Sequence, residues 1–231
     1  MTMNTQIAAD AAAEQARFMT KVYGWMCLAL VVTGYVALWT SSNASIMETL
    51  IGNKFLFYGL IIAEFICVAV LVSVVQRISS TLATLLFLLY AAMNGFTFSV
   101  IFLVFTMDSI GQTFFITAGT FGIMSAYGYF TKRDLTSMGS LATMGLMGIV
   151  LASLVNLWLN SDTVYWVTTY IGVVVFVALT AYDTQKIKNL NIIGNEGTEE
   201  DRKESIIGAL TLYLDFINLF LMLLRLFGRR R

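Results

Sequence analysis

Three acidic residues lie within or at the edge of strongly apolar segments, where an ionised carboxylate is costly. Glu64 stands in FYGLIIAEFICVAVLVSVV, Asp183 in VALTAYDTQKIK, and Asp215 near the middle of TLYLDFINLFLMLLRLFG. A charge at the centre of a membrane helix costs about 2.5 kcal/mol or more on insertion scales. Such residues therefore face the interior, pair with another group and mark ion or proton paths. The alternative is a buried hydrogen bond that only fixes helix packing.

Asp183 and Asp215 are the natural partners among these three. One apolar segment ends at Asp183 and the next starts near residue 207 on the same side, which puts Asp215 about 12 Å deep. If the earlier helix continues through Lys188, the two carboxylates meet. Two close carboxylates share one proton and titrate as a unit, and their oxygens suit a divalent cation. We therefore predict that the pair holds either one shared proton or a divalent cation on an ion or proton path.

Arg225 and Asn218 are the polar residues nearest to Asp215 in the chain. Arg225 follows too far along the helix to neutralise the pair, so it contacts Glu64 or snorkels beside the arginines of the C-terminus. Asn218, one turn from Asp215, is expected to hydrogen-bond it or to line the same cavity.

The composition indicates a chain dissolved in lipid. Of 231 residues, 58% are apolar and 12% are charged, with a mean hydropathy of +0.78, whereas soluble domains carry about 25% charged residues. The zero net charge gives no indication of a nucleic-acid partner. There is no histidine, which argues against the usual zinc, haem and triad chemistry. Cys27 and Cys67 lie in apolar runs as packing residues, and we predict no cofactor.

Several segments are long enough to cross a bilayer, which takes about 20 apolar residues. They span residues 22–40, 55–75, 82–105, 112–130, 139–159, 163–183 and 207–227. We predict an all-α polytopic membrane protein, a seven-transmembrane-helix bundle over 22–228, between a cytoplasmic tail (1–21) and a basic tail (229–231). The connection 189–205 is predicted to be a solvated loop.

Lysine and arginine are distributed unequally between the two sides of the membrane. With a cytoplasmic N-terminus, nearly all loop lysines and arginines fall inside and only Lys54 falls outside, as the positive-inside rule requires. Seven crossings then put Arg229–Arg231 outside, against the rule, unless the last segment re-enters and returns. The orientation of the C-terminus stays open.

Small residues recur every fourth position in 112–130, at Ala118, Gly122 and Ala126. This spacing lets two membrane helices approach closely. The simpler explanation is that small residues are common in membrane helices.

Two stretches, LYLDFINLFLMLLRLFG at 212–228 and AYDTQKIK at 181–188, resemble the signatures of the Bax inhibitor-1 family, also called the transmembrane Bax inhibitor motif family. MTKVYGWM, YGYFTKRDLTSMG and IVLASLVNLWL are similar to its bacterial inner-membrane branch. The resemblance implies a central C-terminal helix, a di-aspartyl pH sensor at Asp183 and Asp215, a contact between Glu64 and Arg225, and a pH-dependent calcium leak.

One position departs from the family pattern. Some members carry an arginine near the cytoplasmic end of the second helix that contacts the aspartate pair, and here Val75 stands in its place. Arg77 substitutes for it only if that helix rotates or shifts.

Three functions fit these residues. The first is a passive, pH-sensitive calcium or cation leak channel. The second, an intramembrane aspartyl protease, shares the carboxyl pair but requires a Gly-x-Gly-Asp motif and a proline motif, and the chain has no proline. We therefore do not expect an enzyme. The third is a non-transporting regulator with a partner such as a membrane protease or a stress-response complex.

Overall fold

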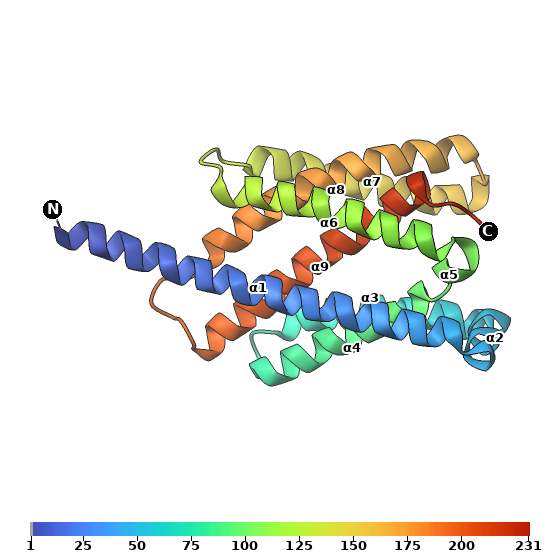
Figure 1. Ribbon diagram of the computed structural model, residues 1–231, viewed down its shortest axis with the longest axis horizontal. Coiled ribbons are helices and arrows are strands. Elements are labelled where there is room, and N and C mark those ends of the chain that lie inside the picture. Colours follow the sequence, from blue (N-terminus) through green and yellow to red (C-terminus); the bar gives the residue numbers. More distant parts are fainter. Residues whose placement is uncertain (1) are drawn as a thin grey trace. The chain divides into compact units, whose positions relative to one another are not determined.

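The computed structural model describes residues 2–231 of the chain, with side chains from residue 9 onward. Over these residues the helices are α1 (Thr2–Ser42), α2 (Ala44–Gly52), α3 (Lys54–Val74), α4 (Ser80–Phe98), α5 (Ile101–Val104), α6 (Met107–Phe130), α7 (Thr136–Leu159), α8 (Asp162–Leu190) and α9 (Glu199–Phe227) (Figure 1). Within the described residues, Phe105 and Arg230 form an isolated antiparallel β-bridge. The all-α class is confirmed.

Six stretches of the described chain are long and apolar enough to cross a membrane: Ala9–Ser42, Lys54–Val74, Ser80–Val104, Thr136–Leu159, Asp162–Leu190 and Glu199–Phe227. The protein is thus a polytopic membrane protein. The predicted 112–130 segment lies within α6, whose serine, threonine and glycine residues make it less apolar, so a seventh crossing stays a prediction. In α9, 72% of the most apolar stretch is buried, against 44% or less in the other spans.

The chain divides into two compact units, which we describe separately. Unit 1 contains the chain up to Val104, Lys188–Tyr213 and Arg231, and unit 2 contains Phe105–Ile187 and Leu214–Arg230. The first half of α9 therefore belongs to unit 1 and the second half to unit 2.

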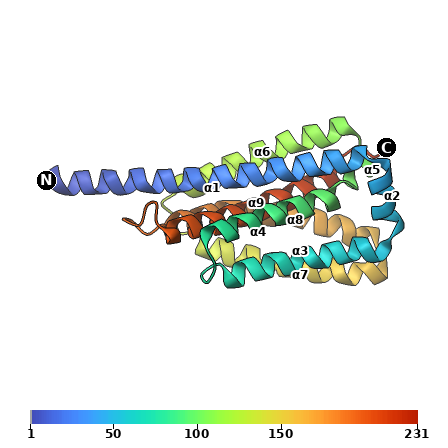
Figure 2. The same ribbon diagram turned by 90° about the horizontal axis from the view of Figure 1, so that it is seen from below.

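In unit 1, α1 and α3 both pack against α4 (Figure 2). The buried stripe of α1 recurs at helical spacing and comprises Phe18, Val22, Met26, Ala29, Thr33, Ala37 and Thr40. Tyr213 of α9 is fully buried in this unit, edge-on to the rings of Phe87 and Tyr90. Because the Thr33 hydroxyl has backbone carbonyls to donate to, the Tyr213 hydroxyl donates to Thr33 across 2.7 Å.

In unit 2, α6 contributes a narrow buried face made of Ser109, Thr113, Thr117, Phe121, Ser125 and Gly128. The Phe121 ring meets the Phe216 ring of α9 edge-on, with the ring centroids 5.5 Å apart. The stripe of Ala118, Gly122 and Ala126 does not form the packed face of α6 within the described chain, because Gly122 faces open space and Ala126 is exposed. Because an α-helix has 3.6 residues per turn, residues at every fourth position shift gradually around α6. The buried face of α6 is instead the one that carries the serine and threonine hydroxyls and Phe121.

Two predicted boundaries differ from the structure. The predicted tail 1–21 is helical from Thr2 and continues into the first span without a break, with Phe18 and Met19 buried. The predicted solvated loop 189–205 is wrong for most of its length, because α8 continues to Leu190 and α9 begins at Glu199. Because α9 is one continuous helix, it contains no turn at which the last segment could reverse direction and return to the side from which it entered.

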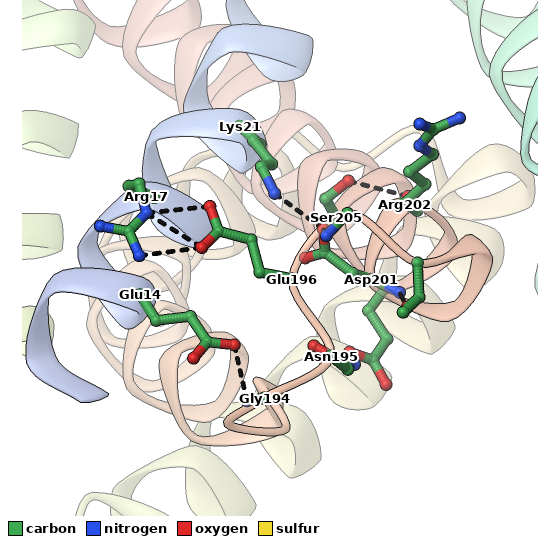
Figure 3. A network of polar contacts seen from close by, with 12 residues as sticks. Glu14, Arg17, Lys21, Gly194, Asn195, Glu196, Asp201, Arg202 and Ser205 are labelled. Carbon is green, nitrogen blue, oxygen red and sulfur yellow. Dashed lines mark hydrogen bonds and ion pairs between the residues drawn. The ribbon is translucent and has the colours of Figure 1, made fainter. Parts of the chain in front are cut away.

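Two charged residues of that predicted loop, Glu196 and Asp201, have partners on α1, as Figure 3 shows. Asp201, whose side chain is 1% exposed, pairs with Lys21 at 2.7 Å and accepts the Gly197 amide at 2.8 Å. Arg17 donates to both carboxylate oxygens of Glu196, at 2.8 and 2.9 Å. These residues are charged yet ordered because each finds an opposite charge about 180 positions away in the chain.

We expect Lys21→Met to destabilise the protein by about 3 kcal/mol, because it leaves the Asp201 carboxylate buried without its cation. This is the low end for a broken buried pair, since the Lys21 side chain is 35% exposed. Thermal unfolding in detergent measures the loss. The double variant Lys21→Met/Asp201→Asn should recover part of it, and an unchanged midpoint for Lys21→Met would show that the pair contributes nothing.

The Arg17–Glu196 pair should make the stability of the folded protein depend on pH. The side-chain hydrogen bond from Arg17 lowers the pKa of the Glu196 carboxyl. The pair therefore stabilises fully above the ordinary glutamate pKa and is lost as pH falls through the lowered value. Glu196→Gln should flatten this part of the thermal midpoint against pH, whereas Glu200→Gln should not. Parallel profiles for the wild type and Glu196→Gln would contradict the assignment.

Candidate functional site

The carboxyl groups of Asp183 and Asp215 lie within hydrogen-bonding reach of each other in unit 2. Both residues are buried, with 9% and 5% of their surfaces exposed. Asp183 is able to face α9 because α8 does not end there but continues in regular helix to Leu190. The structure thus brings the two predicted site residues together.

Asp215 depends on Asp183 for its polar contact. No hydrogen-bond donor of the described residues reaches its buried Oδ2 atom, and the neighbouring polar group is the Asp183 carboxyl. Ionised carboxylates only accept hydrogen bonds, so a bond between two carboxyl groups requires a proton on one of them. The arrangement can hold a single proton between α8 and α9.

Close backbone approach places α8 against its neighbours at this level. A Cβ added to Gly128 of α6 would collide with the Ala181 carbonyl, and one added to Gly139 of α7 would collide with the Tyr182 ring. Thr184 directly follows Asp183, and its hydroxyl is hydrogen-bonded to the Ser125 hydroxyl of α6 at 2.8 Å. Both glycines lie in YGYFTKRDLTSMG, but periodicity alone did not single them out.

Gln185 is a structural residue of the site that the sequence reasoning missed. Its Nε2 donates to the Arg133 carbonyl at 2.8 Å, and its Oε1 accepts the Leu135 amide at 2.9 Å. The α6–α7 connection is thereby held against α8 two residues beyond Asp183. The only signal in the sequence was a polar amide inside AYDTQKIK, which indicates no partner by itself.

Asn218 has a different partner from those expected. Its Nδ2 donates to the Leu214 carbonyl of the same helix at 2.8 Å. The Asn218 amide makes no hydrogen bond to the Asp215 Oδ2 atom, and the alternative, that Asn218 lines the same cavity, stays a prediction.

The remaining predicted residues lie on other elements. Glu64 of α3 accepts a hydrogen bond from the Thr97 hydroxyl of α4. The Arg225 guanidinium of α9 stacks on the Tyr165 ring, 5.3 Å from its centroid. Arg77 lies in the turn after α3 and is exposed. The predicted roles of Glu64 and Arg225 as mutual partners, and of Arg77 as a latch, stay predictions.

The carboxyl pair offers a cation only part of a coordination shell. Among the described residues no group of three or more histidine, cysteine or acidic side chains is placed to hold a metal ion. Calcium takes six to eight oxygen ligands, so an ion passing Asp183 and Asp215 would keep water on its other sides. This chemistry favours transient contact over a closed metal centre.

The fold and the site define a class: an all-α polytopic membrane protein whose last two long helices are joined through a buried carboxyl pair. The profile of the family Bax1-I, described as inhibitor of apoptosis-promoting Bax1, matches residues 15–231. The chain belongs to this family, and the resemblance seen in the motifs is confirmed.

Relatives match over nearly the full length. The inner membrane protein YbhL of Escherichia coli K12 is 55% identical over 93% of this chain and 92% of its own. An uncharacterized protein of Rickettsia prowazekii is 47% identical over 93% and 90%, and one of Deinococcus radiodurans is 40% identical over 92% and 90%. The family match over residues 15–231 includes both aspartate motifs.

Gly128→Ala should test whether close packing of α6 on α8 maintains the site. We expect a loss of about 1–3 kcal/mol or more, because the added methyl group meets backbone that cannot rotate away. Gly122→Ala on the same helix is the control, since nothing lies within 4 Å of its added Cβ. Equal effects of the two changes on thermal stability in detergent would contradict the packing argument.

Proposed function

We propose that this protein is a pH-gated cation leak pathway of the bacterial inner membrane, with calcium as the favoured ion and the Asp183–Asp215 pair as the gate. The observation that carries the proposal is the contact of two buried carboxyl groups, on neighbouring helices, in a chain without histidine. Carboxyls are then the groups available to sense protons within the membrane. The names of relatives such as YbhL support the inner membrane as the location.

The gating step is a change of charge between α8 and α9. With one proton the pair is held by a hydrogen bond and carries one negative charge, whereas without it two negative charges repel each other. With two protons the pair is neutral. Each state favours a different packing of the two helices, so pH changes their populations. The orientation that accompanies this proposal has the N-terminus in the cytoplasm, as the lysine and arginine distribution favours.

We expect calcium-dye liposomes containing the wild-type protein to show a flux that changes severalfold from mildly alkaline to mildly acidic pH. Asn mimics a protonated aspartate, so Asp215→Asn should give a flat profile at the level that the wild type approaches in acid. Asp183→Asn should flatten the profile in the same way, because the two groups titrate as one unit.

Asp108→Asn is the matched control. Asp108 is an exposed acidic residue in the first turn of α6, so this variant should keep the wild-type profile. A pH-independent wild-type flux, no flux at any pH, or an Asp215→Asn profile equal to wild type would each overturn the proposal. In the absence of flux, crosslinking to a stoichiometric membrane partner would favour the regulator instead.

A further inference from the structure

A polar cavity of about 390 Å³ lies in unit 2, at the ends of three helices. It is lined by Ser153, Asn156, Leu157, Asn160, Ser161, Asp162, Tyr165, Thr168 and Arg225. Of these residues only Leu157 has a purely apolar side chain, in contrast to the exposed leucines, valines and methionines elsewhere on α7. The polar residues recur at helical spacing on α7 and on α8, so each helix turns one polar stripe toward the cavity.

Arg225 is held at this cavity with its hydrogen-bonding edge unused. Its guanidinium carbon lies over the Tyr165 ring, 5.3 Å from the ring centroid, and a cation–π contact of this kind uses none of the N–H groups as hydrogen-bond donors to an acceptor atom. Among the described residues Arg225 has no salt bridge and no hydrogen-bond acceptor for its side chain. A half-buried guanidinium with five donors is complementary to an oxyanion.

Asp162 supplies the opposite charge on the same cavity wall. It lies one turn before Tyr165 on α8 and forms no ion pair with Arg225 within the described chain. Asn156 fixes the wall next to it, because its Oδ1 accepts the Ser161 amide at 2.9 Å. Its Nδ2 has no acceptor among the described residues and remains available to a ligand. One cation and one anion therefore face a shared space without neutralising each other.

We propose that this cavity binds a small zwitterion that carries an oxyanion and a primary ammonium group, with the oxyanion on Arg225 and the ammonium on Asp162. The site lies outside the carboxyl pair and goes beyond the proposed leak function. Two sources supply this chemistry: free amino acids, and the head group of phosphatidylethanolamine. A cavity with one charge of each sign favours such a molecule over a simple anion or cation, because both charges of the zwitterion find an opposite charge in the cavity.

Calorimetric titration of the detergent-purified protein tests the site, with glycine and phosphoethanolamine as probes and acetate and methylammonium as single-charge controls. We expect at least one zwitterion to bind more tightly than both controls. Binding of glycine identifies the amino-acid source, and binding of phosphoethanolamine alone identifies the lipid head group. Failure of both zwitterions to bind, or binding no tighter than acetate, would overturn the proposal.

Two variants assign the contacts. Arg225→Gln and Asp162→Asn should each weaken zwitterion binding by about tenfold to a hundredfold, the range for losing one charge-assisted hydrogen bond. Asp162 is exposed, so its variant should fold, and thermal midpoints check both proteins. Asp108→Asn, outside the cavity, should bind as the wild type does. Equal affinities of the wild type and Asp162→Asn would exclude the ammonium contact and with it the zwitterion.

Discussion

The carboxyl group of Asp215 imposes the strictest requirement on this structure. It lies on the most enclosed span with 5% of its surface exposed, so it must be neutralised or hydrogen-bonded inside the protein. The contact with Asp183 meets that requirement, but only when α8 runs past Asp183 as an unbroken helix and approaches α9 closely. Thr184 and Gln185, which follow Asp183 directly, hold α8 to α6 and to the α6–α7 connection.

The site is built mainly by small residues and hydroxyl groups rather than by large side chains. Gly128 and Gly139 remove the Cβ atoms that would keep α6 and α7 away from α8. In lipid there is little hydrophobic drive between helices, so close van der Waals contact and interhelical hydrogen bonds hold a bundle together. The helices around the carboxyl pair are therefore held by contacts that are numerous but individually weak.

Much of the architecture follows from hydropathy, and the carboxyl pair follows from the cost of burying an acid. The family motifs at 181–188 and 212–228 then placed both aspartates on helices. The start of α9 could not be predicted in this way, because Asp201 looks like a solvated loop residue until its partner Lys21 is known. A hydropathy window contains no information about a lysine 180 positions earlier.

Side-chain direction was the other point at which sequence reasoning failed. Asn218 is one turn from Asp215, yet its amide turns back to the Leu214 carbonyl, a choice that local spacing does not determine. The small-residue stripe of α6 likewise identified a spacing but not the face that packs. Both outcomes depend on neighbours supplied by other helices.

The contacts of Lys21 with Asp201 and of Arg17 with Glu196 also constrain the order of biosynthesis. Each joins a residue near the start of the chain to one close to its end. During translation the N-terminal portion of α1 must wait, with its two cations unpaired, until almost the entire polypeptide has left the ribosome. Closure of these pairs is therefore among the last events in assembly, and a chain truncated before α9 would keep the packing of α1 on α4 but lose both ion pairs.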